Sequence, residues 1–345
     1  MKSIGNFLAG ICAILFALTG VLALFLFNLE WKAFSAGTYK QAFKEQGLYE
    51  GAPALIAGML TDTAQEETNG EPPFAAILGK NGLESILTTL VPPDQLEALT
   101  DSILDAVFAF INGESGSITV SLAPIKKNLT GEAGVQAFMQ VLSASPDCTP
   151  EQVLQFALGS LSTEEGLTLC NPPEEAMSLV APLIESQVRS MMNGIPDEIK
   201  LPLAAQGRSR QFIERLDRIR ILMQLSLLIP IAFLFLILIF AVRNLNGLLK
   251  WWGIPLIIAG SVSAIFALVG APAIRLLLDF LFRQGTSGMP AVLLDLIPDM
   301  AGSLARQILT PLAVEGVILA LLGTGMLVAL RIRNRAALAA DIANG

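Results

Sequence analysis

Three cysteines and no histidine limit the chemistry that this chain of 345 residues can perform. Because histidine is absent, a cysteine nucleophile assisted by histidine is excluded. The sequence also has no glycine-rich phosphate loop, no zinc-ligand spacing and no nucleophile elbow. We therefore predict no catalytic residue, no cofactor and no metal site, and we expect a protein that is not an enzyme.

Two of the cysteines, Cys148 and Cys170, have the most definite chemistry. Each precedes a pattern that starts a helix, with Thr149 or Asn171 in the capping position and with proline and acidic residues in the first turn. A disulfide between them would tie the two helix starts together and stabilise the fold by about 3 kcal/mol. We expect this bridge if the segment lies in an oxidising compartment. Two unrelated thiols are the alternative. We interpret the third cysteine, Cys12, as a residue of helix packing.

Acidic residues form two further patterns. Adjacent pairs such as Glu66-Glu67 point in different directions on a helix, so we interpret them as charges of helix starts and loops. On the helix predicted at residues 93–113, four carboxylates recur at steps of three and four residues. A straight helix does not converge such groups on a metal ion, so we expect a solvated face. These residues are Asp94, Glu97, Asp101 and Asp105.

Four long apolar runs in the sequence determine where these residues lie. A helix crosses the bilayer core, about 30 Å thick, in about 20 residues, and each run is long enough for this. The runs are uninterrupted and lack the alternation of a barrel strand, so we predict helices. The first run is too long for the apolar part of a cleaved signal peptide and is predicted to be a permanent anchor.

Glu315 is the only charged residue within these runs. Because the fourth helix is predicted to begin at Pro311, we expect Glu315 in its first turn, facing lipid headgroups and the positive end of the helix. A transport or channel role is the alternative. In that case Glu315, and Pro230 with the kink that we expect it to cause, would lie near a pathway.

Basic residues near the helix ends predict the orientation, because they stay preferentially in the cytoplasm. Lys2, Arg243, Lys250 and the arginines of residues 331–335 fall on one side, although five arginines of residues 208–220 oppose this orientation. Both termini are therefore expected in the cytoplasm, with the protein in the plasma (inner) membrane. The predicted order is a cytoplasmic N-terminus (1–4), transmembrane helix (5–27), helical extracytoplasmic domain (28–220), transmembrane helix (221–242), cytoplasmic loop (243–250), transmembrane helix (251–274), outer amphipathic segment docking on the main outer domain (275–310), transmembrane helix (311–330) and cytoplasmic tail (331–345).

The predicted fold class is an all-α membrane protein with four transmembrane helices and a mostly helical extracytoplasmic domain. Residues 117–122 are the best strand candidate, and one such strand makes no sheet alone, so we expect an extended connector. Residues 28–220 carry 25 acidic against 13 basic residues. This excess of negative charge argues against nucleic acid and anionic lipid as partners of the domain, and it is compatible with cations, basic peptides or solubility.

The sequence resembles a group of uncharacterised bacterial membrane proteins. The resemblance lies in the order of the helices, in Tyr39 and the stretch Tyr49-Glu50-Gly51-Ala52-Pro53, and in the helix starts at Cys148 and Cys170. Its members have one N-terminal anchor helix, a large helical extracytoplasmic domain and three C-terminal transmembrane helices. The resemblance implies this topology and no functional residues. We predict a non-catalytic protein that uses its outer domain to bind or scaffold an envelope protein or peptide, with the lipid bilayer as its other partner. The sequence does not fix the oligomeric state.

Overall fold

The structure of the protein is a computed structural model. It describes residues 2–66, 74–157, 162–163, 166–167, 170–173, 182, 185–186, 188–190, 192–201, 207–285 and 291–344. The chain forms two compact units. We call Met1–Ala42 with Ala205–Gly345 the membrane unit, and Phe43–Ala204 the inserted unit.

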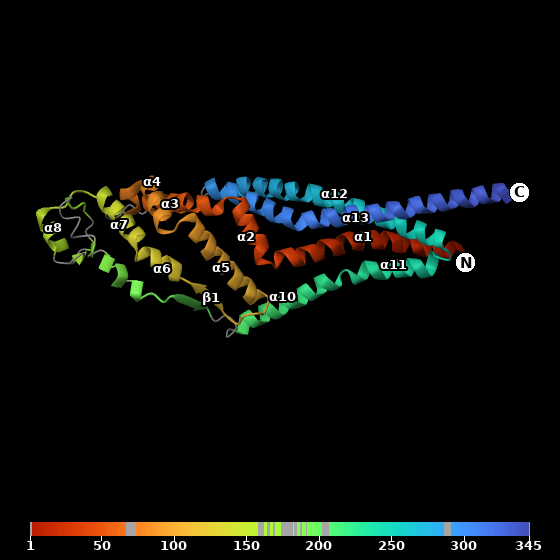
Figure 1. Ribbon diagram of the computed structural model, residues 1–345, viewed down its shortest axis with the longest axis horizontal. Coiled ribbons are helices and arrows are strands. Elements are labelled where there is room, and N and C mark those ends of the chain that lie inside the picture. The colour runs from red at the N-terminus through yellow and green to blue at the C-terminus, as the bar shows by residue number, and fades with distance from the viewer. Residues whose placement is uncertain are drawn as a thin grey trace. The chain divides into compact units, whose positions relative to one another are not determined.

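The membrane unit contains four helical spans that are long and apolar enough to cross a membrane, which confirms the predicted fold class of an all-α membrane protein. The helix α1 packs against α10, α11, α12 and α13, and α12 packs along α13. Figure 1 shows the two chain ends at the same end of this bundle. The helices are α1 (Lys2–Ala33), α10 (Gly207–Leu225) and α11 (Leu228–Ala241), which together make the second span, α12 (Leu245–Gly285) and α13 (Ala291–Asn344).

Glycines let α12 and α13 approach each other closely. A Cβ atom added at Gly260 would overlap the carbonyl oxygen of Gly316, and one added at Gly323 would lie 2.6 Å from the carbonyl oxygen of Gly253. Ser263 on α12 is completely buried. Close packing of small residues is what associates helices in lipid, where the surroundings are as apolar as the helices themselves. The α12–α13 pair therefore depends on its glycines.

Both helices are longer than the sequence predicts. Residues 275–285 continue α12, and α13 already begins at Ala291 and passes through Pro298 and Pro311. Residues 275–285 and 291–310 therefore belong to two long helices, which are joined by an ion pair of 2.6 Å between Arg275 and Asp299. Membrane helices tolerate such prolines because neighbouring helices and local adjustments satisfy the freed backbone groups. The predicted docking of the segment 275–310 on the outer domain stays a prediction.

The second span is interrupted where Pro230 predicts a kink. Helix α10 ends at Leu225 and α11 begins at Leu228. Proline has no N–H to donate to the carbonyl of Ser226, four residues earlier, and its ring clashes with that carbonyl. The Ser226 carbonyl instead accepts a hydrogen bond of 3.2 Å from the N–H of Ile229. The break between the two helices therefore follows from the sequence.

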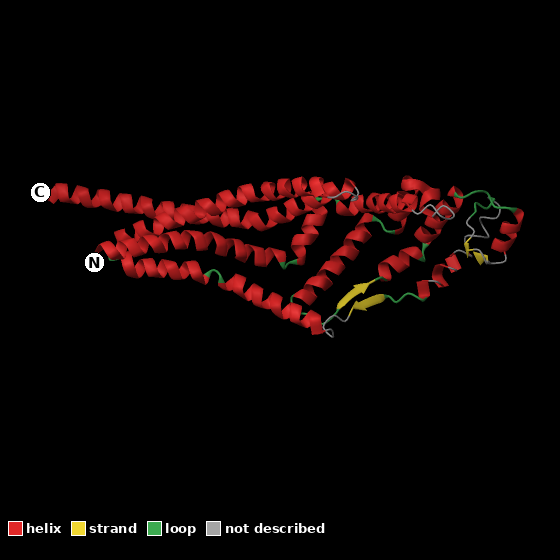
Figure 2. Ribbon diagram, turned by 180° about the vertical axis from the view of Figure 1, so that it is seen from behind, coloured by secondary structure: helices red, strands yellow, loops and turns green. Residues whose placement is uncertain are grey.

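The inserted unit is mostly helical, with short strands (Figure 2). Helix α3 packs against α4 and α5, and α4 packs against α6 and α7. A small apolar cluster around Ile86, Ala137 and Val141 lies between α4 and α7. The described elements are α2 (Ala36–Glu45), which leads into the unit, α3 (Leu48–Glu66), α4 (Phe74–Leu90), α5 (Pro93–Ile111), β1 (Ile118–Ser121), α6 (Ala123–Leu129), α7 (Glu132–Ala144), α8 (Pro150–Ala157), β2 (Ser162–Thr163), β3 (Gly166–Leu167) and β4 (Glu198–Leu201).

Residues 118–121, within the segment expected to be an extended connector, form a strand with a partner far away in the sequence. Strand β1 pairs antiparallel with β4, so that Ile118 lies opposite Leu201 and Ser121 opposite Glu198. Strand β4 is short and far away in the sequence, and its alternation is too brief to stand out. The segment is therefore one half of a two-stranded ribbon and not an isolated connector.

Replacement of Gly316 by valine should separate α12 from α13, because a Cβ atom there would lie 2.7 Å from the carbonyl oxygen of Gly260. We expect a loss of about 1–3 kcal/mol, the usual result of overpacking, measured as a lower melting temperature of the purified protein in detergent. Gly325→Val is the matched control, because a Cβ atom at Gly325 would have no atom within 4 Å apart from the adjacent backbone of its own helix. Equal melting temperatures of the two variants would contradict the glycine contact.

Candidate binding groove and polar layer

Helix α8 begins with a capping box, as the sequence predicts for Thr149. The N–H of Gln152 donates to Oγ1 of Thr149 at 3.3 Å, and the N–H of Thr149 donates to Oε1 of Gln152 at 2.8 Å. These reciprocal bonds satisfy two backbone donors at the helix start. They also fix the direction of the backbone that follows Cys148. The corresponding helix expected after Asn171 begins at residues outside the described part of the chain.

A disulfide joins Cys148 to Cys170, with a distance of 4.8 Å between their Cα atoms. Next to it, the N–H of Cys148 donates to the carbonyl of Asn171 at 3.0 Å, and the N–H of Asn171 donates to the carbonyl of Pro146 at 2.8 Å. Cys170 is 3% exposed and packs against the completely buried Leu142 of α7. The bridge therefore joins two chain segments that are also held by backbone hydrogen bonds and by a small core.

A groove of about 820 Å³ lies beside this disulfide. Its volume is in the range of sites that bind small molecules or short peptide segments. The wall combines apolar surface from prolines and a valine with a few polar groups, and the amide of Asn171 donates to the carboxylate of Asp147 at 3.4 Å. The lining residues are Ser143, Asp147, Cys148, Pro150, Val153, Asn171, Pro172 and Pro173.

The acidic stripe of α5 is not simply a solvated face. Lys44 pairs with Glu97 at 2.9 Å, and the phenol of Tyr49 donates to Asp101 at 3.5 Å. Tyr49 itself is 3% exposed. The amphipathic pattern alone cannot reveal partners that come from the preceding helices. Two of these acids therefore help to hold α5 against the chain that leads into the inserted unit. Among the described residues, no group of three or more histidine, cysteine or acidic side chains could hold a metal ion.

The membrane unit contains a buried ion pair between its first two spans. Glu30 of α1 is 6% exposed, and its carboxylate accepts bonds of 3.1 Å from Arg220 and from Gln224 of α10. The guanidinium of Arg220 also lies 4.8 Å from the centre of the Phe34 ring. Arg220, one of the five arginines that oppose the predicted orientation, is therefore paired with a carboxylate and is not a free positive charge.

Glu315 lies in the middle of α13 and not in its first turn, so the expectation that it faces the positive end of a helix is wrong. Its carboxylate accepts a hydrogen bond of 2.7 Å from the side-chain amide of Asn28, which is completely buried on α1. The physical reason is the continuity of α13 through Pro311, which places Ala291 at the helix start. A buried polar group in a helix bundle needs a polar partner. Here α1 supplies the amide of Asn28 and α13 supplies the carboxylate of Glu315.

The structure does not bring Glu315 and Pro230 together. Pro230 lies 3.9 Å from the position of a Cβ atom at Gly20 of α1, whereas Glu315 bonds to Asn28 of the same helix. At 1.5 Å per residue, these two levels are about 12 Å apart along α1. The two residues of the alternative transport hypothesis therefore belong to different layers of the bundle.

Tyr49 should ionise only in strongly alkaline solution. Burial, followed by the charges of Asp101 and Glu97, raises its pKa from 10.0 to about 12. Between these two values the folded state holds a proton that the unfolded state has lost, so the stability of the inserted unit should fall as pH rises. An ultraviolet titration of tyrosinate in a Tyr39→Phe background, where Tyr49 is the only tyrosine left, measures this pKa. A midpoint near 10 would contradict the burial of the phenol.

Removal of the positive partner of Glu30 should destabilise the membrane unit. Arg220→Gln leaves a buried carboxylate without its counter-charge, which costs on the order of 3 kcal/mol, and the double variant Glu30→Gln with Arg220→Gln should recover most of this loss. Melting temperatures in detergent provide the measurement. Arg218→Gln, an exposed neighbour on the same helix, is the control. The ion pair would be structurally unimportant if Arg220→Gln and Arg218→Gln melted alike.

Comparison of the chain with family models, with curated proteins and with solved structures gave no match. The resemblance to bacterial membrane proteins with one anchor helix and three closing helices therefore stays a prediction.

Proposed function

We propose that this protein is a membrane-anchored binding or scaffolding protein of the cell envelope, with its inserted unit outside the cytosol. The groove beside the Cys148–Cys170 disulfide is the observation that carries this proposal. In this function the four spans hold the unit at the membrane surface. The groove then binds an extended segment of an envelope protein or peptide without catalysing a reaction.

The disulfide supports a location outside the cytosol, because disulfides persist in oxidising compartments and are rare in the cytosol. The basic residues near the opposite helix ends support the same orientation, since Lys2, Arg243 and Lys250 favour the cytoplasmic side. These two arguments are independent of each other. One depends on redox chemistry and the other on the insertion of charged residues into a membrane.

The construction of the groove supports binding by preorganisation. The disulfide, the backbone bonds around Asn171 and the rigid rings of three prolines hold the walls before a ligand arrives. A preformed site loses less conformational freedom on binding, so more of the contact energy is available as affinity.

The charge of the groove and of its unit supports a basic partner. Asp147 contributes a carboxylate to the wall, and residues 28–220 carry 25 acidic against 13 basic residues. Complementary charge steers a positively charged peptide toward such a surface and orients it there. The ligand class that fits best is therefore an extended segment with small apolar side chains and at least one lysine or arginine.

Site-specific photo-cross-linking of the full-length protein in intact cells tests this function. A photoreactive residue in place of Val153, which is half-buried in the wall, should give a discrete adduct with an envelope protein. The same residue in place of Glu114, which is exposed on a loop of the inserted unit, is the matched control and should give none. The adduct should be lost when Cys148→Ser and Cys170→Ser open the wall.

Two outcomes would contradict the binding function. The first is the absence of any adduct specific to Val153. The second is an ion or solute flux through reconstituted vesicles that collapses in Glu315→Gln, because that result would favour the transport alternative and would assign the function to the membrane unit.

A further inference from the structure

Within the described part of the chain, one edge of strand β4 is unpaired. Among the described residues, β1 is the only strand that pairs with it. All four residues of β4 are exposed, and two of them are large and apolar, with Ile199 41% and Leu201 49% exposed. A two-stranded ribbon is marginally stable by itself, and an unpaired edge with apolar side chains is a template for a further strand.

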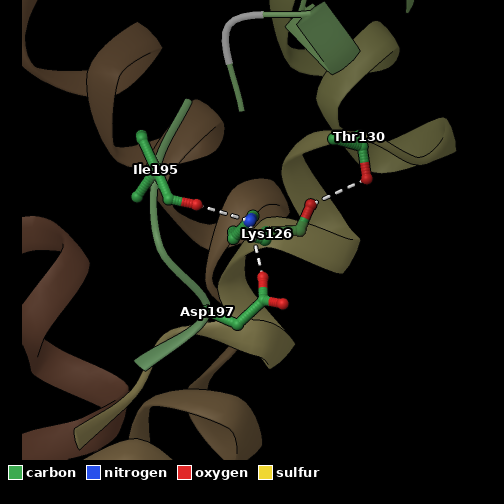
Figure 3. Close-up of polar contacts among 4 residues, drawn as sticks. All are labelled: Lys126, Thr130, Ile195 and Asp197. Carbon is green, nitrogen blue, oxygen red and sulfur yellow. Dashed lines mark hydrogen bonds and ion pairs between the residues drawn. The ribbon is translucent and has the colours of Figure 1, made fainter. Parts of the chain in front are cut away.

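The chain holds β4 in position from its N-terminal side. The ammonium group of Lys126 on α6 donates to the carbonyl of Ile195 at 2.6 Å and pairs with the carboxylate of Asp197 at 2.6 Å (Figure 3). The Lys126 side chain is only 18% exposed. This clamp fixes the backbone just before the strand, so that the edge is already extended before any partner binds. Such preorganisation lowers the cost of strand addition.

The hydrogen bonds of the ribbon determine which groups face the free edge. The N–H of Leu122 donates to the carbonyl of Asp197 at 2.7 Å, which makes these two residues a hydrogen-bonded pair. Such pairs alternate along antiparallel strands. The backbone groups of Ile199 therefore point toward β1, whereas those of Glu198 and Lys200 point outward and are available to another strand.

Charge selects one register for a second β4 strand. If the outward groups of two antiparallel copies bond to each other, Glu198 can lie opposite Glu198, Lys200 opposite Lys200, or Glu198 opposite Lys200. The first two registers oppose like charges, which is unfavourable across strands. The third forms two Glu–Lys pairs and places Ile199 opposite Ile199. Within one chain, Glu198 and Lys200 lie on the same face of β4, and Nζ of Lys200 is 3.4 Å from Oε2 of Glu198.

We propose that β4 pairs antiparallel with β4 of a second copy of this chain, with Glu198 of each copy opposite Lys200 of the other. Two ribbons then become one four-stranded sheet about a two-fold axis, which is the self-complementary contact typical of homodimers. The contact covers Ile199, and it brings two copies of the groove into one assembly. It goes beyond the proposed binding function and does not depend on it.

Cysteine cross-linking in membranes tests the register. In a Cys12→Ala background, Ile199→Cys should form a disulfide-linked dimer under mild oxidation, because residues that face each other at a non-hydrogen-bonded pair have Cα atoms about 4.5 Å apart. Glu198→Cys and Lys200→Cys should remain monomeric when expressed separately. They should cross-link to each other when two differently tagged chains are co-expressed.

Charge exchange tests the choice of partner and controls for misfolding. Glu198→Lys places the new lysine opposite Lys200 of the other copy. It should weaken dimerisation in liposomes about 2- to 30-fold, which is the usual range for the loss of two cross-strand pairs. Lys200→Glu should have an effect of the same size. The double variant Glu198→Lys with Lys200→Glu should restore the dimer. Resonance energy transfer between labelled copies at increasing protein density measures the change.

Three results would overturn the proposal. One is a wild-type chain that stays monomeric at every density in the membrane. Another is Lys200→Cys alone cross-linking as well as Ile199→Cys. The third is a cross-link from Ile199→Cys to a different protein in place of a second copy, which would assign the edge to a foreign strand.

Discussion

Within hydrocarbon no water is present, so the backbone N–H and C=O groups of each span must form their hydrogen bonds inside the protein. The segments that cross the bilayer must therefore be helical apart from short breaks, such as the one at Ser226, whose backbone groups find other partners. Larger irregular structure lies before, after or between the spans. The inserted unit, with its groove, its disulfide and its ribbon, lies between α1 and α10 for this reason. Since α1 packs beside α10 and α11, the inserted residues leave and re-enter the bundle at neighbouring positions.

Polar contacts of the bundle lie near the end of α1, where the chain leaves the bundle, and in α10, where the chain returns to it. Glu30 lies where α1 ends and Arg220 lies in α10, so their ion pair joins the two ends of the insertion. Asn28, two residues earlier on α1, joins the same level to α13 through Glu315. Polar groups that would be costly in lipid therefore act as links between spans. The close contacts of glycines between α12 and α13 hold the other half of the bundle together.

The sequence predicts the features that depend on local chemistry. Uncharged runs predict the spans, Thr149 predicts the cap of α8, and Pro230 predicts the break in the second span, because each effect acts within a few residues. It fails where distant segments decide the outcome. Pro311 was expected to start a helix, but packing against α12 lets α13 continue through it, and this moves Glu315 away from the helix end. The partners of Glu97 and Asp101 come from preceding helices, and β4 is too short to be recognised without β1.

We propose that the inserted unit folds in an oxidising space outside the cytosol and is braced there by its disulfide. Labelling of the full-length protein in intact cells with a membrane-impermeant thiol reagent measures this location. Cys148 and Cys170 should be unreactive at first, and both should react after a membrane-impermeant reductant is added. Labelling of these two residues only after the membrane has been permeabilised would place the unit in the cytosol and contradict the account.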